Sequence, residues 1–98
     1  MANVLKWTDR AIEEYDKLLE YLYGEWGEEI TLRVTLEVEK AIFRIQNSPE
    51  HFPVVQKRRN VRRCVMSPQT SIFFKIKKDY IEISTLFDNR QSPRKLKL

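Results

Sequence analysis

The sequence contains one cysteine, one histidine and two glycines among its 98 residues. A lone cysteine, Cys64, has no partner for an internal disulfide, and no cluster of cysteine, histidine and carboxylate residues has the spacing of a metal site. The chain also lacks an apolar signal-peptide segment at its start and any stretch approaching the roughly 20 apolar residues of a membrane span. We therefore expect a cytoplasmic protein with no membrane attachment, no cofactor and no metal.

The length corresponds to one domain, because domains usually run about 100–150 residues. We expect residues 1–98 to fold around one modest core, which excludes multidomain enzymes and large cofactor-binding folds. Charge is divided unevenly along this domain: residues 1–50 hold 6 basic and 11 acidic residues, whereas residues 51–98 hold 12 basic and 3 acidic residues. A second half with a net charge of +9 favours a polyanionic partner such as nucleic acid.

The first half of the chain has the periodicity of two helices. A short apolar strand, Val4–Trp7, leads into a helix over about residues 9–22, whose apolar residues recur at three- and four-residue spacing. The glycines Gly24 and Gly27 predict a tight reversal after it. A second helix follows over about residues 28–46 and ends before a proline, because the residue preceding proline avoids the helical region.

After the second helix the apolar pattern changes. Residues 49–60 indicate an extended loop, and from Val61 the period becomes two, which is typical of strands. Three strands joined by turns are expected: Val61–Met66, Ser71–Lys77 and Tyr80–Phe87. The predicted fold class is therefore α+β, with an N-terminal strand, a helical hairpin and a three-stranded antiparallel meander, the hairpin being packed on one face of the sheet.

The alternation assigns the strand side chains to two faces. The covered face takes Ile72, Phe74, Ile76, Ile81, Ile83, Thr85 and Phe87. The open face takes Ser71, Phe73, Lys75, Tyr80, Glu82, Ser84 and Leu86. Whether Arg62 and Cys64, or instead Arg63, point toward the open face depends on a one-residue register that stays open at this point.

The element order and several local strings resemble the RelE/ParE superfamily of toxins from type II toxin–antitoxin systems. The strings that carry the resemblance are Trp7-Thr8, Asn47-Ser48-Pro49, Phe52-Pro53, Arg62-Arg63-Cys64-Val65, Ile72-Phe73-Phe74-Lys75-Ile76, Ile81-Glu82-Ile83 and Asp88-Asn89-Arg90-Gln91 followed by Pro93. The resemblance implies that the first strand pairs beside the last. It also implies a growth-inhibiting toxin that a cognate antitoxin neutralises. The target would be DNA gyrase, as for ParE-like members, or messenger RNA on the ribosome, as for RelE-like members.

The residues that the messenger-cutting members use are present only in part. Arg62 matches a basic position on the strand after the helices, and Arg90 matches an arginine beyond the last strand, so these two are the candidate catalytic residues. Ser71 stands where those members have an arginine, and Cys64 stands where a lysine often lies. No tyrosine follows Tyr80. Whether the chain is an endoribonuclease therefore stays open.

Further residues are candidates for binding nucleic acid or another target through charge or stacking. They are Arg58, Arg59, Arg63, Phe73, Lys75 and Asn89. His51 and Cys64 have no partner at the spacing that a catalytic base or nucleophile needs. The alternative to a toxin is a non-catalytic module that holds nucleic acid or protein on the same basic face. A stripe on the second helix, Leu32, Leu36 and Phe43, fits burial against the sheet, an antitoxin helix or a second copy in a homodimer.

Overall fold

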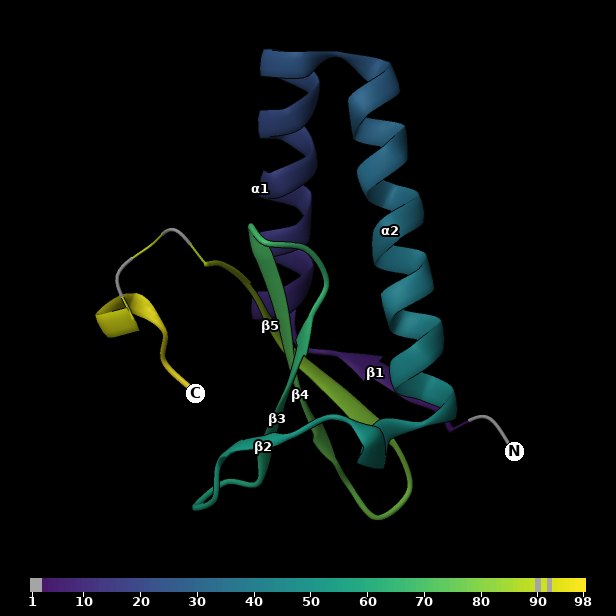
Figure 1. The fold of residues 1–98 in the computed structure, drawn as a ribbon, viewed down its shortest axis with the longest axis vertical. Helices are drawn as coiled ribbons and strands as arrows, with labels where there is room; N and C mark the ends of the chain where they lie inside the picture. The colour runs from purple at the N-terminus through teal and green to yellow at the C-terminus, as the bar shows by residue number, and fades with distance from the viewer. Residues whose placement is uncertain (1–2, 90, 92) are drawn as a thin grey trace.

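The computed structural model, which describes residues 3–89, 91 and 93–98, has a helical layer and a sheet layer (Figure 1). The helical layer is a hairpin of α1 (Asp9–Trp26) and α2 (Glu28–Asn47). The sheet contains β1 (Leu5–Trp7), β2 (Val54–Gln56), β3 (Val61–Val65), β4 (Thr70–Ile76) and β5 (Ile81–Asp88), and short 3₁₀ turns lie at Pro49–His51 and Pro93–Lys95. The predicted α+β class, with the hairpin on one face of the sheet, is confirmed.

One residue, Gly27, joins the two helices. Its φ of 88° lies in the left-handed region that glycine adopts without strain, and its N–H donates to the carbonyl of Tyr23 at 3.1 Å. The prediction that both glycines form the reversal is wrong for Gly24, which lies inside α1. The hairpin end around Gly27 extends beyond the sheet, so the last turns of α1 and the first turns of α2 have no strand beneath them (Figure 1).

The strand order is β1-β5-β4-β3-β2. As the resemblance implied, β1 pairs beside the last strand, and this pair is parallel whereas the other neighbours are antiparallel. The prediction of a loop over residues 49–60 is wrong where β2 forms. This edge strand is three residues long and has an irregular register, and Val54 and Val55 are both exposed. A strand that buries neither face leaves no alternation to read in the sequence.

A β-bulge interrupts the pairing of β4 with β5. Phe73 pairs with Thr85, but the next residue, Phe74, pairs with Ile83, so Ser84 is an extra residue on β5. Such an insertion moves every side chain that follows it to the opposite face of the sheet.

The bulge overturns the predicted faces of β5 beyond Ile83. Leu86, expected on the open face, packs in the main core with the helices. Phe87, expected in that core, lies on the opposite side of the sheet. Ser71 was also expected to be exposed, yet it is fully buried.

A carboxylate from α1 holds the bulge in place. Glu14 Oε1 accepts a hydrogen bond from Thr85 Oγ1 at 2.5 Å and another from the backbone N–H of Leu86 at 3.2 Å. Its second oxygen lies 3.4 Å from Nε of Arg10. The bulge therefore keeps no unsatisfied N–H at Leu86, and α1 is tied to β5.

Two apolar clusters lie on opposite sides of the sheet. The main core, on the helix side, joins Ala11, Ala41 and Ile45 of the helices to Phe52, Cys64, Ile72, Phe74, Ile81, Ile83 and Leu86. The second cluster lies on the tail side, where Leu96 and Leu98 pack against Val61, Phe73 and Phe87.

The placement of Phe73 on an exposed face is therefore wrong. The side chain is 2% exposed, and its ring meets that of Phe87 edge-on at a centroid distance of 6.5 Å. The segment after β5 has a polar and basic sequence, but its two leucines cover this part of the sheet. Alternation along a strand shows which side a residue takes and cannot show that a distant segment returns to cover it.

Candidate functional site

The structure resolves the register of the β3 arginines. Cys64 belongs to the main core, so its neighbour Arg63 lies on the tail side and Arg62 on the helix side. Each guanidinium is held by its surroundings in a different way.

Arg63 belongs to a hydrogen-bond network at the end of the sheet. Its Nε donates to Ser71 Oγ at 2.9 Å and its Nη2 donates to Asn89 Oδ1 at 3.1 Å, while Ser71 Oγ donates to the same amide oxygen at 2.8 Å. The guanidinium also lies over the Phe73 ring, 5.7 Å from its centroid. Arg63, Ser71 and Asn89 thus fix one another, and Asn89 fixes the point at which the tail leaves β5.

Arg62 holds the segment that follows α2. Its Nη1 donates to the carbonyls of Phe52 at 2.7 Å and Glu50 at 3.3 Å. Its Nε is buried and has no hydrogen-bond partner among the described residues. Arg90, the second candidate catalytic residue, lies outside the described residues.

The other predicted basic residues have different surroundings. Arg58 is exposed in the turn between β2 and β3. Arg59 donates from Nη1 to the carbonyl of Leu98 at 3.3 Å. The Lys75 side chain is 18% exposed, and its ammonium lies 3.9 Å from the carboxylate of Glu82.

Arg59 and Lys75 meet in a basic depression of about 300 Å³ on the tail side of the sheet. Two basic residues that sequence reasoning missed, Arg10 and Lys97, line it as well. Arg10 also donates from Nη1 to the carbonyl of Lys97. No local signal could have found this pair, because 87 positions separate the two residues and only the folded tail brings them together.

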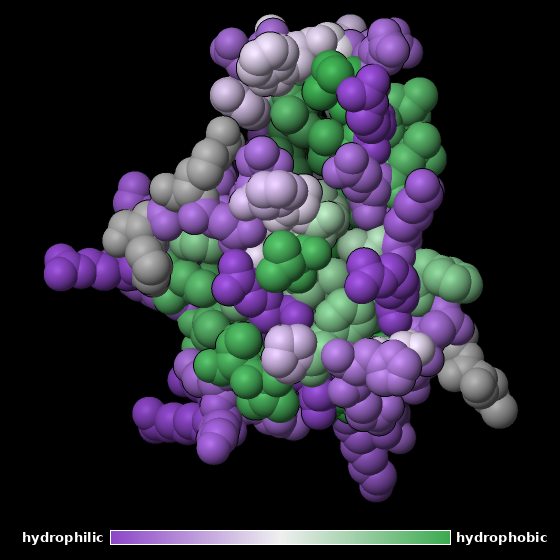
Figure 2. All heavy atoms as spheres, in the orientation of Figure 1, coloured by the Kyte–Doolittle hydropathy of each residue, from purple (hydrophilic) through white to green (hydrophobic). Residues whose placement is uncertain are grey.

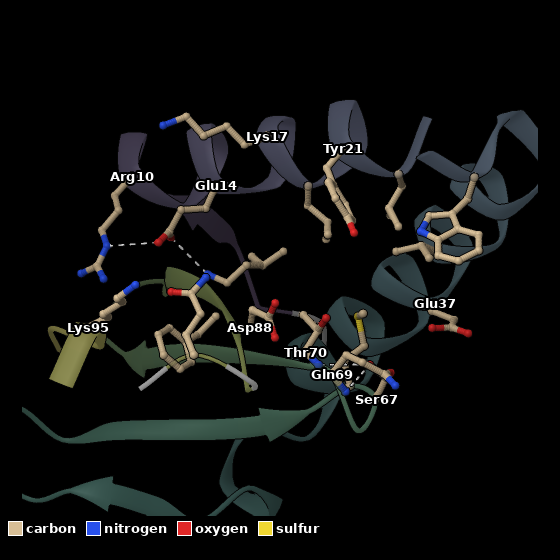
Figure 3. A pocket seen from close by; sticks show the side chains of 18 residues that line it. Arg10, Glu14, Lys17, Tyr21, Glu37, Ser67, Gln69, Thr70, Asp88 and Lys95 are labelled. Carbon is tan, nitrogen blue, oxygen red and sulfur yellow. Dashed lines mark hydrogen bonds and ion pairs between the residues drawn. The ribbon is translucent and has the colours of Figure 1, made fainter. Parts of the chain in front are cut away.

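A larger cavity of about 730 Å³ runs along α1 from Arg10 to Trp26. Figure 3 shows Glu14 and Tyr21 of α1 on one side and the turn with Ser67, Gln69 and Thr70 opposite. Its apolar lining includes Leu18, Leu22, Val34, Met66, Leu86 and Phe87, with Tyr21 and Trp26 at its wall. Charged side chains that include Lys17, Glu37 and Asp88 surround this lining. An apolar floor with a charged rim is suited to an amphipathic segment of a partner protein.

The structure gives Cys64 and His51 no catalytic surroundings. Burial raises the pKa of the Cys64 thiol, and the nearby Arg44 offsets this only in part. The side chain belongs to the main core, and this burial outweighs the charge of the nearby arginine. His51 is exposed on a 3₁₀ turn. Among residues 3–89, 91 and 93–98, no group of three histidine, cysteine or carboxylate side chains is placed to hold a metal ion.

The outer side of α2 carries exposed apolar side chains. Leu32, Leu36 and Phe43 are 58%, 49% and 66% exposed. Figure 2 shows hydrophobic side chains gathered along this edge of the molecule. The stripe is therefore not buried against the sheet, and this one of its three predicted placements is wrong. In the described part of the chain, neither helix is apolar over a length that would cross a bilayer.

A helical hairpin thus covers one face of a five-stranded mixed sheet, and basic residues surround a depression on the other face. The family model described as "ParE toxin of type II toxin-antitoxin system, parDE" matches residues 5–93. The chain belongs to this family and is the toxin component of a type II toxin–antitoxin system. Its partner is a cognate antitoxin.

Solved structures share the fold. A chain of the chromosomal ParDE TA system from P. aeruginosa superposes with a TM-score of 0.76 at 19% sequence identity, over 89% of this chain and 96% of that one. A conserved hypothetical protein from Helicobacter pylori superposes with a TM-score of 0.59 at 17% identity, over 93% of this chain and 98% of that one. No curated protein matches the chain.

Proposed function

We propose that this toxin inhibits growth by poisoning DNA gyrase rather than by cutting messenger RNA. Membership of the ParE family supports this target, since the ParE-like branch of the superfamily acts on gyrase. The observation that carries the choice is the surroundings of Ser71. This residue stands where the messenger-cutting members have an arginine, and here it is a fully buried hydroxyl held between Arg63 and Asn89.

Two further positions of the messenger-cutting arrangement, those of Arg62 and Cys64, also make structural contacts here. Cleavage of RNA without histidine pairs needs basic groups that are free to stabilise the charge developing on the phosphate. Arg62 binds backbone carbonyls of Glu50 and Phe52, and Cys64 is a core residue with a raised pKa. The β3 strand therefore uses its polar groups to hold the fold, which supports a function that does not depend on RNA cleavage.

The two targets leave different traces in cells. Induced synthesis of the toxin without its antitoxin should arrest growth, induce the DNA-damage response and trap gyrase on broken DNA. Arrest of translation with cuts in messengers at the ribosomal A site, and without the DNA-damage response, would contradict the proposal. Arg90→Ala separates the targets further, because a messenger-cutting toxin should lose activity in this variant.

We further propose that the antitoxin docks in the large cavity beside α1. An α-helix with its side chains is about 10–12 Å across and can lay an apolar face on such a floor. Tyr21 and Trp26 remain 53% and 64% exposed at its wall, and exposed aromatic residues of this kind often supply most of the binding energy of an interface.

Substitutions along α1 test this docking site. Binding of the cognate antitoxin should weaken by about 2 kcal/mol, roughly 30-fold in Kd, for Trp26→Ala or Tyr21→Ala. Tyr23→Ala is the matched control, since Tyr23 is 63% exposed on the same helix and does not line the cavity. Equal weakening by all three substitutions, measured by calorimetry, would refute the assignment.

A further inference from the structure

We propose that the basic depression on the tail side of the sheet, formed by Arg10, Arg59, Lys75 and Lys97, binds a backbone phosphate of duplex DNA. The inference deepens the proposed function and rests on it for the identity of the nucleic acid, because gyrase holds a DNA duplex. The basic depression lies on the tail side of the sheet, whereas the cavity assigned to the antitoxin runs along α1 from Arg10 to Trp26. Arg10 lines both.

Charge is the first argument for an anionic ligand. The four basic residues come from α1, from the turn before β3, from β4 and from the tail, so the fold brings them together from distant parts of the sequence. Among the described residues, Glu82 is the one acidic side chain in the lining, and Glu14 pairs with Arg10 beside it, so the four basic side chains exceed the acidic ones by two. Val61 and Leu98 line the same depression, and an apolar lining lowers the local dielectric and strengthens binding of an anion.

Lys75 supplies the second argument. Its side chain is 18% exposed, and the described residues give its ammonium one ion-pair partner, Glu82, at the long distance of 3.9 Å. Glu82 in turn accepts a hydrogen bond from Ser84 Oγ at 3.1 Å. An ammonium has three N–H donors, and a largely buried one is costly unless they find acceptors. Phosphate oxygens in the depression would supply these acceptors.

The two arginines give the depression its shape. Arg10 and Arg59 each donate from Nη1 to a tail carbonyl, of Lys97 and Leu98 respectively, and so hold the tail against the sheet. Arg10 also pairs with Glu14 at 3.4 Å. A guanidinium has five donors, so each keeps further N–H groups for a ligand.

The volume and the adjoining surface favour a polyanion. A cavity of about 300 Å³ is larger than a phosphate group, which leaves room for bridging waters. Lys57 and Arg58 are exposed in the turn that carries Arg59, so a backbone leaving the depression meets further positive charge. Phosphate contacts of this kind position a protein on DNA without reading the sequence.

Salt-dependent binding of a fluorescein-labelled 20-base-pair duplex, followed by anisotropy, tests the site directly. Each phosphate contact adds about 0.9 to the magnitude of the slope of log K against log salt, so Lys75→Gln and Lys97→Gln should each lower that magnitude by about 1. Affinity at 50 mM NaCl should fall about threefold to tenfold in each variant. Lys75→Arg, which keeps the charge, should retain the slope.

Lys40→Gln is the matched control, because Lys40 is an exposed lysine on α2 that does not line the depression. The side chain of Lys97 is exposed, so Lys97→Gln tests the site even if Lys75→Gln fails to fold. Equal slopes for Lys97→Gln, Lys40→Gln and the unmodified protein would overturn the phosphate site. An acidic 20-residue peptide that competes with DNA at equal charge concentration would also overturn it, because the ligand would then be a polypeptide.

Gyrase assays show whether the phosphate site or the gyrase target is the proposal that fails. Binding of duplex DNA needs no gyrase, so a toxin that binds DNA through Lys75 and Lys97 but leaves gyrase unaffected refutes the gyrase proposal alone. A toxin that poisons gyrase equally well with and without Lys75→Gln, and whose DNA slope is unchanged, refutes the phosphate site alone.

Discussion

Glu14→Ala tests whether the bulge in β5 depends on the carboxylate from α1. The substitution removes the acceptor of both Thr85 Oγ1, at 2.5 Å, and the backbone N–H of Leu86, at 3.2 Å. A hydrogen bond to a charged group contributes about 1.5–3 kcal/mol, and an unsatisfied buried donor costs about 1–3 kcal/mol. Thr85 is fully buried, but the Glu14 side chain is 29% exposed, so water can replace part of what is lost. The free energy of unfolding should fall by about 2–3 kcal/mol.

Urea unfolding followed by far-ultraviolet circular dichroism measures this change. Glu14→Gln keeps one acceptor oxygen and should lose roughly half as much. Glu13→Ala is the control on the adjacent residue, whose carboxylate is 66% exposed and pairs with Lys17, and such surface pairs contribute about 0–1 kcal/mol. In thermal unfolding, Glu14→Ala should lower Tm by about 8–24 °C, given about 4–8 °C per kcal/mol for a domain of this size. A loss no greater than that of Glu13→Ala would refute the role assigned to Glu14.

Three further predictions concern the two sides of the sheet. Phe73→Ala should cost about 3–5 kcal/mol of stability because the ring is buried under the tail, and a loss below 1 kcal/mol in urea unfolding would place it at the surface. Ser71→Ala should lower the free energy of unfolding by about 1–3 kcal/mol, because Arg63 and Asn89 lose the hydroxyl that they share. Growth arrest should persist when the variant is expressed at equal level. Loss of growth arrest would give Ser71 a direct functional role. Because burial raises the pKa of Cys64, the folded state holds the thiol proton more tightly than the unfolded state does. The free energy of unfolding should therefore be full below the ordinary thiol pKa of about 8.5 and fall as pH rises through the raised pKa. Urea midpoints between pH 7.5 and 10 should show this fall, and Cys64→Ala should lack it; parallel curves would contradict it.

The helices and the order of the elements could be predicted because their signals are local. The apolar spacing along α1 and α2 marks the face that packs on the sheet, and the glycine between them marks the reversal. The place of β1 beside β5 came from the resemblance, since three residues paired across the length of the domain leave no local pattern.

The errors lie where one part of the chain changes the surroundings of another. The extra residue Ser84 reverses the faces of β5 beyond it, and a bulge has no sequence signal of its own when no glycine marks it. Leu96 and Leu98 read as isolated apolar residues in a basic tail, yet they bury Phe73. The same folding of the tail brings Lys97 to Arg10, so the basic depression could not be predicted from spacing.

Purified gyrase provides the most direct test of the account. Supercoiled plasmid is incubated with gyrase, ATP and the purified toxin, and the reaction is then stopped with detergent and protease. Linear DNA should accumulate with toxin concentration and disappear when the antitoxin is added first. Absence of linear DNA, together with cuts in messenger RNA when the same toxin preparation is added to translating ribosomes, would contradict it.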